Sequence, residues 1–380
     1  MKFGNEAETA LDINAGEEAW NNMKESASEQ IYEELRKSKY PVYIWGAGMM
    51  GTKVKNRLAE NGVHVEGFFV DVDHFNREAA SEGEHIYLLD ELEKRCDSID
   101  VVIGHGHYEK KKVVEALPFV HKVYMIAFPY LQYRLSGIGE WIEKNREVYD
   151  DIMKRLADDS SRRALHAYCM VNETDDAEYL LQDDIIIKDM FDFEGLHLTE
   201  EEKYVDIGAW IGDTIELFTK KTGGRYEHIY AVEPDPDSLE KLRENVGDYE
   251  DISIYSCGLG SKEEEVFLAV DGEVRQSTRL VSKKEDDSQM SVKIKTLDEL
   301  FGQESVSLVK IFVPFLFPDI LQGGKECLLR DRPRLLVNIA VGNDTKFFEV
   351  IRWLLDLETN YQVALRFDMA MSTRLTLCAY

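Results

Sequence analysis

Apolar residues recur along the chain in short runs that alternate with helical periodicity, and this alternation begins near Pro41. The run Val42–Trp45 is followed by a glycine turn, a helical stretch that ends near Asn61 and a second apolar run at 65–70. Strand, helix and strand in this order form the βαβ unit of a parallel sheet. Three more elements continue the series: a strand at 100–104, a helix at about 109–117 and a strand at 122–126.

A second alternating series begins at Tyr204. The pattern predicts strands at 204–208, 228–232, 252–257, 306–313 and 334–341, and helices at 213–221, 236–246, 318–329 and 345–357. A variable stretch rich in Lys, Glu, Asp and Ser, at 261–291, interrupts these elements. Two final β runs, 361–367 and 374–380, are separated by a turn and favour an antiparallel pair at the edge of the sheet.

Two segments show helical periodicity without strands. Residues 1–39 are polar and acidic, with apolar positions that favour a leading amphipathic helix: Trp20, Met23, Ile31 and Leu35. Residues 131–195 carry an apolar stripe formed by Trp141, Val148, Ile152 and Leu156, and a turn at 158–161 can cap a further helix. The predicted fold class is α/β: two Rossmann-like, doubly wound parallel-sheet domains, at 40–130 and 196–380, joined by a helical connector at 131–195.

Length, charge and cysteine content limit the number of domains and the kinds of partner that the protein can have. A chain of 380 residues is too long for one ordinary hydrophobic core, which agrees with two domains. A formal net charge of −28 disfavours nucleic acid and anionic membranes as partners, because both repel an acidic protein. Five single cysteines favour reduced thiols, and neither a signal peptide nor a membrane span is visible. We expect a cytoplasmic protein without membrane insertion, and a homo-oligomer is an open alternative to a monomer.

The first strand of the second series ends in a glycine turn, within the run YVDIGAWIGDT. Asp206 ends the strand, and Gly208 and Gly212 lie in the turn into the next helix, where glycine lets a ligand approach the backbone. Asp206 and Asp213 can accept hydrogen bonds from the ammonium group of a ligand. A tight turn in any α/β protein would also use these glycines, so the motif alone leaves both interpretations open.

Two further strand ends supply groups near the same turn. Glu233 follows the strand at 228–232 and suits a bidentate contact with ribose hydroxyls. Cys257 and Gly258 end the third strand, where an adenine would lie. Because the ends of successive parallel strands meet at one edge of a sheet, these groups are expected to form one crevice. The crevice favours S-adenosylmethionine (SAM) as the cofactor.

The C-terminal half resembles FkbM-type methyltransferases. The resemblance rests on the runs YVDIGAWIGDT, IYAVEPDPDSLEKLREN, SCGLGS, TLDELF and VSLVKI. It extends upstream, since some bacterial members carry an N-terminal nucleotide-binding-like domain, as in VYIWGAGMMGTKV, and a helical connector, as at 140–167. The resemblance implies a class I methyltransferase fold with an antiparallel edge pair, and SAM-dependent O-methylation of sugar or polyketide hydroxyls.

One segment departs from the family pattern. Where the family reads Lys-Ile-Asp-Val-Glu-Gly-Ala-Glu, this chain has KIFVPFLF from residue 310, so carboxylates are replaced at Phe312, Pro314 and Phe317. Where members carry Tyr-His-Lys-Pro downstream, this chain reads NIAVGND from Asn338 to Asp344. Methyl transfer to a hydroxyl requires a group that takes the proton, and carboxylates and histidine are its usual sources.

These losses leave the catalytic residues unknown and two hypotheses open. In the first, the chain is an active SAM-dependent O-methyltransferase whose base is an acid from elsewhere, such as Asp319, Asp344 or Glu326. In the second, the chain is a catalytically impaired SAM-binding protein with a binding or regulatory role. Each acid is also explained as a solvated surface charge. We expect the active enzyme, acting on a small-molecule or glycan acceptor.

The N-terminal domain has its own glycine motif, Gly46-Ala-Gly48-Met-Met-Gly51, between a strand and a helix. Gly46 would make the turn, Gly48 admit a pyrophosphate, Gly51 allow helix packing and Asp71 hold a ribose. Only one mononucleotide-binding half is visible, so a structural scaffold is the alternative to a bound nucleotide. An NAD-dependent oxidoreductase is the third functional hypothesis.

No metal site is expected in the chain. His105 and His107 flank a glycine after a strand, but no third ligand is recognisable nearby. The cations at 110–112 are expected on a solvated helix face, and Arg275 with Arg279 would meet an anionic acceptor only if their loop folds over the site.

Overall fold

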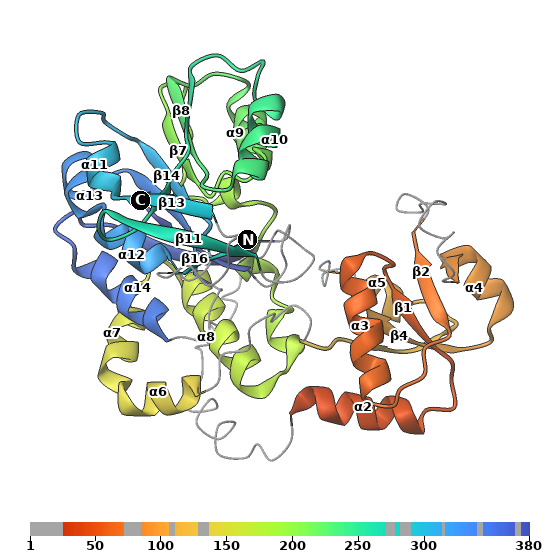
Figure 1. Cartoon of the computed structure of the whole chain (residues 1–380). Helices are drawn as coiled ribbons and strands as arrows, with labels where there is room; N and C mark the ends of the chain where they lie inside the picture. The colour runs from red at the N-terminus through yellow and green to blue at the C-terminus, as the bar shows by residue number, and fades with distance from the viewer. Residues whose placement is uncertain are drawn as a thin grey trace, which may run out of the picture. The chain divides into compact units, whose positions relative to one another are not determined.

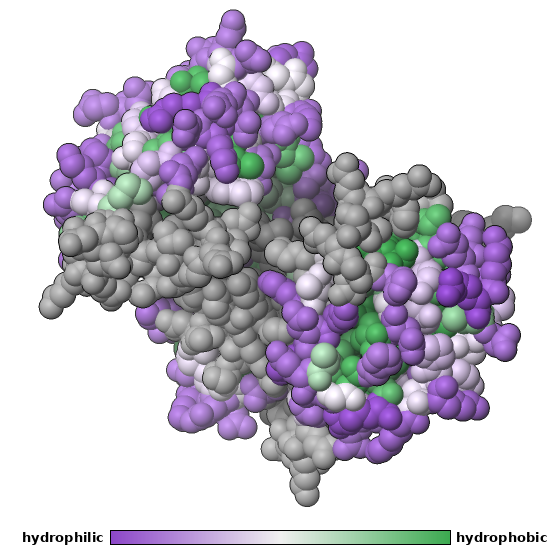
Figure 2. All heavy atoms as spheres, turned by 45° about the vertical axis from the view of Figure 1, so that its right-hand side comes forward, coloured by the Kyte–Doolittle hydropathy of each residue, from purple (hydrophilic) through white to green (hydrophobic). Residues whose placement is uncertain are grey.

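Figure 1 shows the computed structural model of the chain, which describes residues 26–71, 85–105, 111–127, 137–270, 278–281, 290–313, 316–339, 345–368 and 374–380. The chain divides into two compact units. The first unit comprises Met1–Gln132, Gly137–Glu143 and Cys169–Leu181, and the second comprises Tyr133–Ser136, Lys144–Tyr168 and Gln182–Tyr380. Trp20 and Met23 of the predicted leading helix lie outside the described residues. Hydrophilic residues make up most of the coloured surface in Figure 2, in agreement with the net charge of −28.

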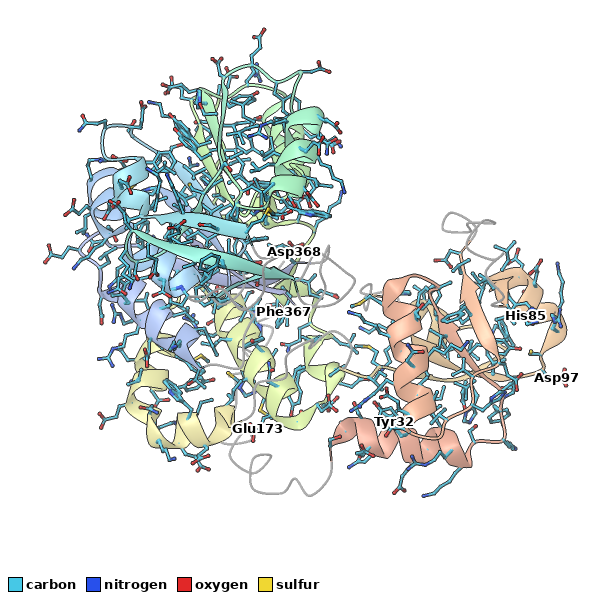
Figure 3. All side chains as sticks on the ribbon, in the orientation of Figure 1. Tyr32, His85, Asp97, Glu173, Phe367 and Asp368 are labelled. Atoms are coloured by element: carbon cyan, nitrogen blue, oxygen red, sulfur yellow. The ribbon has the colours of Figure 1, made fainter. Side chains whose placement is uncertain are left out.

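A five-stranded parallel sheet forms the middle of the first unit, in the order β3-β2-β1-β4-β5. Its strands are β1 (Val42–Trp45), β2 (Gly67–Val70), β3 (Ile86–Leu88), β4 (Ile99–Ile103) and β5 (Val120–Tyr124). Its helices include α2 (Ala27–Lys37), α3 (Met49–Glu60), α4 (Leu89–Arg95) and α5 (Lys111–Glu115). The core packs Ile44 of β1 against Leu58 of α3 and Tyr32 of α2, which Figure 3 labels. The predicted Rossmann-like layer is confirmed.

The sequence pattern missed β3 and α4. Strand β3 has three residues, all half-buried, so it lacks the apolar run that identified the other strands. Helix α4 has seven residues and buries only Leu92, which is too little periodicity for a prediction.

An eight-stranded mixed sheet forms the middle of the second unit, in the order β6-β16-β17-β15-β14-β7-β8-β9. Its strands are β6 (Ile186–Ile187), β7 (Lys203–Ile207), β8 (His228–Val232), β9 (Ile252–Tyr255), β14 (Leu308–Ile311), β15 (Arg334–Asn338), β16 (Val363–Asp368) and β17 (Arg374–Ala379). All neighbouring strands are parallel except β17, which is antiparallel to β15 and β16. The predicted antiparallel pair is therefore confirmed, and β6 extends the sheet beyond it.

The helices of the second unit follow its strands closely. They include α7 (Arg146–Arg155), α9 (Asp213–Thr222), α10 (Pro236–Asn245), α11 (Leu297–Leu300), α12 (Phe317–Gln322), α13 (Lys325–Asp331) and α14 (Lys346–Asp356). The single helix predicted at 318–329 is divided into α12 and α13 by Gly323 and Gly324. A Cβ at Gly323 would lie 2.1 Å from the carbonyl oxygen of Gly260, so two chain segments pass closely where only glycine fits.

A small four-stranded sheet occupies the charged stretch that the sequence analysis called variable. It consists of β10 (Gly258–Leu259), β11 (Glu264–Val270), β12 (Thr278–Val281) and β13 (Met290–Lys295), in the order β10-β13-β11-β12. Val266, Val292 and Ile294 form its small core. Because so few apolar side chains are needed, charged residues between them hid the alternation in the sequence.

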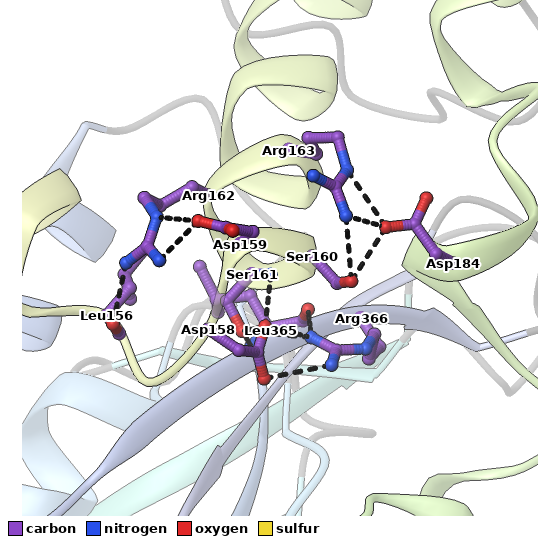
Figure 4. A network of polar contacts seen from close by, with 10 residues as sticks. All are labelled: Leu156, Asp158, Asp159, Ser160, Ser161, Arg162, Arg163, Asp184, Leu365 and Arg366. Carbon is purple, nitrogen blue, oxygen red and sulfur yellow. Dashed lines mark hydrogen bonds and ion pairs between the residues drawn. The ribbon is translucent and has the colours of Figure 1, made fainter. Parts of the chain in front are cut away.

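The predicted helical connector contains α6 (Ile138–Lys144), α7 and α8 (Asp159–Thr174), and its residues are divided between the two units. Asp158 caps the start of α8, where its Oδ1 accepts hydrogen bonds from the amide and hydroxyl of Ser161 (2.6 and 2.8 Å). The same carboxylate binds Arg366 of β16 at 3.0 Å, and the amide of Leu365 donates to the Ser161 hydroxyl at 3.0 Å. Figure 4 shows how this network joins the start of α8 to β16.

Candidate functional site

In the turn after β7, every second residue has a positive φ angle. Gly208, Trp210 and Gly212 have φ angles of +75°, +47° and +89°. These values lie in the left-handed region, which favours glycine. A Cβ at Gly208 would lie 3.0 Å from Cγ2 of Val313 and 3.1 Å from the carbonyl oxygen of Phe312. The turn therefore passes close to the end of β14 as it leads into α9.

Asp206, at the end of β7, is fully buried and binds three side chains. Its Oδ1 accepts a hydrogen bond from Nζ of Lys310 (2.6 Å), which also donates to the carbonyl of Gly208 (3.0 Å). Its Oδ2 accepts from the hydroxyls of Thr214 (2.5 Å) and Tyr204 (3.1 Å). Burial and the neighbouring carboxylate raise the pKa of Tyr204 well above its ordinary value, so the phenol keeps its proton. Contact of Asp206 with a ligand ammonium stays a prediction, while its link through Lys310 to the turn is observed.

Glu233, directly after β8, has its carboxylate fixed by two backbone amides. Its Oε2 accepts from the amide of Trp210 and its Oε1 from the amide of Asp235, both at 2.9 Å. Burial raises the pKa of Glu233, although both amide hydrogen bonds act in the opposite direction. Each oxygen retains a lone pair for a further donor. The carboxylate thus connects the ends of β7 and β8 and suits the ribose contact that the sequence predicted.

The other predicted cofactor residues have no hydrogen bond to Glu233 among the contacts described for this turn. Asp213 is the exposed first residue of α9, and Gly212 caps that helix. Strand β9 ends at Tyr255, two residues earlier than predicted, and Gly258 instead begins β10 and pairs with Ile294 of β13. Cys257 is buried, and burial raises the pKa of its thiol. Hydrogen bonds thus join the turn to Glu233, whereas a shared crevice with Cys257 and Gly258 stays a prediction.

The other half of the same sheet edge combines apolar and buried polar side chains. Phe312 follows β14 and is half-buried, with Nζ of Lys310 5.1 Å from its ring centroid. Asn338 ends β15 and stands opposite Thr376 of β17, and both are buried. Asp368, labelled in Figure 3, is the fully buried last residue of β16. An acceptor at this edge would meet an apolar group beside the turn and polar groups further along.

Sequence motifs alone assign no role to Lys310, Thr376 or Asp368, whose positions emerge only from the fold. Lys310 and Asp206 are 104 residues apart, and only the pairing of β14 with β7 makes them neighbours. Asp368 is the last residue of β16, and Thr376 is the third residue of β17 and lies between two leucines. A polar residue at such a place is the signal that was available, because buried polar groups usually serve a specific contact.

The proposed sources of a catalytic base lie on short helices after β14. Asp319 is exposed in the first turn of α12, and Glu326 is exposed in the first turn of α13. The amide of Glu326 donates to Oδ2 of Asp298 at 3.1 Å. Asp344 and Pro314 lie outside the described residues. Phe317 is buried at the start of α12, so the side chain there is packed and apolar.

In the first unit, Gly46, Gly48 and Gly51 shape the turn between β1 and α3. Gly46 has a φ of +107°, and a Cβ at Gly51 would lie 1.9 Å from the Gly46 carbonyl oxygen. Gly48 caps α3, and a Cβ there would meet no atom within 4 Å. Asp71 follows β2 and is half-buried. The tight turn accounts for Gly46 and Gly51, and a nucleotide at Gly48 and Asp71 stays a prediction.

The remaining sequence candidates add no second centre to the described part of the chain. The ring of His105 lies edge-on to Trp45, with centroids 4.3 Å apart. His107, Lys110 and Arg275 lie outside the described residues. Among the residues that the structure describes, no three His, Cys, Asp or Glu side chains are grouped to hold a metal ion. Within the same ranges, no helix has the length and apolarity needed to cross a membrane.

Comparison with solved structures supports the class of fold. A methyltransferase FkbM from Methylobacillus flagellatus KT is 18% identical and matches 93% of this chain and 93% of that chain, with a TM-score of 0.60. An rRNA methylase from Streptococcus thermophilus is 15% identical over 48% of this chain and 87% of that chain, with a TM-score of 0.30. A methyltransferase from Streptococcus mutans in complex with SAH is 13% identical over 47% of this chain and 89% of that chain, with a TM-score of 0.29. The match to the first of these structures confirms the predicted α/β methyltransferase fold.

Comparison with family models identifies the domain. Residues 206–363 match the model of the methyltransferase FkbM domain, which begins at Asp206. No curated protein gives a significant match to the chain. The resemblance inferred from the sequence motifs is therefore confirmed for residues 206–363, which match the methyltransferase FkbM domain.

Proposed function

We propose that this protein is a SAM-dependent methyltransferase that methylates an oxygen atom of a sugar or a related hydroxyl acceptor. The observation that carries the proposal is the connected group of Gly208, Trp210 and Glu233. There a left-handed turn and an oriented carboxylate meet at the carboxyl edge of the sheet. In open α/β sheets this edge is the usual place for a ligand.

In this proposal, the methionine, ribose and adenine parts of SAM would each contact a different group of the protein. The methionine part would lie against the turn from Gly208 to Gly212, where glycine allows a ligand to approach the backbone closely. Glu233 would accept hydrogen bonds from the ribose hydroxyls, and Cys257 with Gly258 would border the adenine. Bound SAM supplies an electrophilic methyl group on a positively charged sulfur. The protein's own part is to orient this group and to exclude water.

The acceptor hydroxyl has to lose a proton during methyl transfer, and none of residues 312–318, which directly follow β14, is an acid that could take it. Asp319, Asp344 and Glu326 remain candidates for this base. Asp368 joins them, because it is a buried carboxylate at the end of β16 on the same edge. A general base contributes about 10²- to 10⁴-fold in rate, so replacing the correct acid by its amide would lower kcat by that order.

A second function is favoured by Phe312. An apolar ring directly after β14 gives a hydroxyl no proton acceptor, which suits a protein that binds SAM for a regulatory purpose without transferring methyl. Methyl transfer by the purified wild type to any sugar or hydroxyl acceptor would exclude this alternative. SAM binding without transfer to a broad acceptor panel would support it.

Isothermal titration of SAM into the full chain tests the cofactor site. We expect Glu233→Ala and Asp206→Asn to weaken SAM binding, and Glu240→Ala, which removes an exposed acid from α10, to leave it unchanged. Thermal unfolding of each variant separates loss of binding from loss of fold. Absence of SAM binding by the wild type would refute the proposed function. A parallel titration with NAD(H) tests the nucleotide hypothesis for the first unit.

A further inference from the structure

Trp210 occupies a backbone position that normally belongs to glycine. It is the middle member of three alternating residues with positive φ, and the other two, Gly208 and Gly212, are glycines. A bulky residue is unfavourable in this conformation because its Cβ approaches the following carbonyl. The amide of Trp210 donates to Glu233, so the backbone conformation serves that contact, and glycine would serve it equally well. The side chain itself therefore needs a separate explanation.

Packing within the protein does not supply that explanation. Trp210 is 39% exposed, whereas buried aromatic side chains of the same unit, such as Tyr204 and Phe218, stack on each other. Across the described ranges, the indole of Trp210 makes no ring contact, cation–π contact or hydrogen bond. Strained backbone conformations in folded proteins concentrate at sites that bind ligands.

We propose that the indole of Trp210 contacts the sulfonium-bearing part of SAM and favours the positively charged methyl donor over its uncharged product, S-adenosylhomocysteine (SAH). This inference rests on the proposed SAM site. In that site, the turn from Gly208 to Gly212 would lie against the methionine part of the ligand, which carries the sulfonium charge. Tryptophan has the aromatic face that attracts cations most strongly.

The charges around the turn make an aromatic contact useful. Lys310 already binds the carboxylate of Asp206, and Glu233 is directed by the amides of Trp210 and Asp235. An aromatic face can stabilise a sulfonium ion without offering a nucleophile that would accept its methyl group. It also covers the charged sulfur with an apolar surface and so keeps water away.

The test compares the dissociation constants of SAM and SAH, which differ in the charge on sulfur. Calorimetric titrations use the full-length wild type, Trp210→Leu, Trp210→Phe and the control Leu329→Ala, which shortens another exposed apolar side chain of the second unit. We expect Trp210→Leu to weaken SAM binding by about 3- to 30-fold and SAH binding much less. Trp210→Phe should retain part of the preference, and Leu329→Ala all of it.

Each result has a distinct meaning. Equal weakening of SAM and SAH in Trp210→Leu, or no change in either, would overturn the inference while leaving the proposed function intact. Failure of the wild type to bind both ligands would overturn the proposed function together with the inference.

A second variant guards against a purely structural effect. Trp210→Gly removes the indole but keeps a backbone that adopts positive φ freely, so we expect the fold to be retained while SAM binding weakens more than SAH binding. Equal weakening of SAM and SAH together with a lower Tm would mean that Trp210 only supports the fold and would contradict the proposed contact.

Discussion

Lys310 is 2% exposed and makes both of its hydrogen bonds inside the second unit, to Asp206 and to the carbonyl of Gly208. A buried ion pair is a weak stabiliser compared with apolar residues of the same shape. Removing one partner is costly, however, because the other charge stays buried alone. The pair therefore makes the shape of the ligand-facing turn depend on two strands at once.

We predict that Lys310→Met lowers the free energy of unfolding by about 3–5 kcal/mol, since it leaves the Asp206 carboxylate buried without its cation. The double variant Asp206→Asn, Lys310→Met should recover much of this loss. Denaturant unfolding of the single and double variants forms a double-mutant cycle. Additive effects of the two substitutions would show that the pair is not coupled.

The environment of Glu233 predicts a pH dependence of SAM binding. Burial raises the pKa of Glu233, so the group takes up a proton at higher pH than an ordinary glutamate. The protonated form has lost an acceptor for a ribose hydroxyl, and SAM affinity should fall as the pH is lowered towards this raised pKa. Titrations between about pH 8 and about pH 5 measure the effect. Glu233→Gln should bind more weakly and show a flatter profile.

The sign of the linked stability effect is opposite. Because the folded-state pKa of Glu233 is raised, its contribution to stability is full below the ordinary pKa and is lost as the pH rises through the raised value. Loss of SAM affinity on acidification therefore cannot come from unfolding caused by this group. Tm values recorded over the same pH range provide the control.

At the scale of elements, the turn between β1 and α3 contains two glycines that differ in the space available for a side chain. A Cβ at Gly51 would lie 1.9 Å from a backbone oxygen, whereas a Cβ at Gly48 would meet no atom within 4 Å. We predict that Gly51→Ala destabilises the first unit by about 1–3 kcal/mol through overpacking, and that Gly48→Ala has little effect. Thermal unfolding of both variants measures the difference. Similar losses in the two variants would contradict this account.

The junction of α8 with β16 depends on Asp158 and Arg366. Burial opposes ionisation of Asp158, but the hydrogen bonds from Arg366 and Ser161 hold the pKa of the carboxyl below its ordinary value. Because this pKa is lowered, the stability it contributes is present above the ordinary aspartate pKa and is lost as the pH falls through the folded-state value.

We predict that Arg366→Met costs about 1–2 kcal/mol at neutral pH, reduced from the value for a buried pair because Asp158 is partly exposed. The cost should shrink on acidification. Arg225→Ala, which removes a surface ion pair with Glu200, should change stability by no more than about 0.5 kcal/mol. Denaturant unfolding at two pH values tests both variants.

At the scale of the whole molecule, the division into two compact units predicts separable responses. A ligand that binds one folded unit stabilises it by about 2.7 kcal/mol at a hundred times its Kd. We expect SAM to raise the calorimetric transition of the second unit, and Gly51→Ala to lower only that of the first. A single transition shifted by both changes would show that the chain unfolds as one cooperative body.

Most strands of both sheets were predictable from the sequence because each is buried between other layers and therefore reads as an apolar run. Strand β8 was predicted without error at 228–232, and β1 at Val42–Trp45. Short, half-buried elements such as β3 were missed, since three residues cannot show a period. The strands of the small third sheet were missed for a different reason, because charged residues between their few apolar side chains hid the alternation.

By itself, the sequence determined the α/β class, the order of the main elements and the FkbM-type motifs. These features depend on local periodicity and on glycine turns, and both involve residues that are close together in the chain. Only the tertiary structure decided that Lys310 pairs with Asp206, that Glu233 is held by the Trp210 amide, and that buried Asp368 lies at the same sheet edge. These relations join residues far apart in the chain, and they arise from strand order and register, which local sequence does not encode.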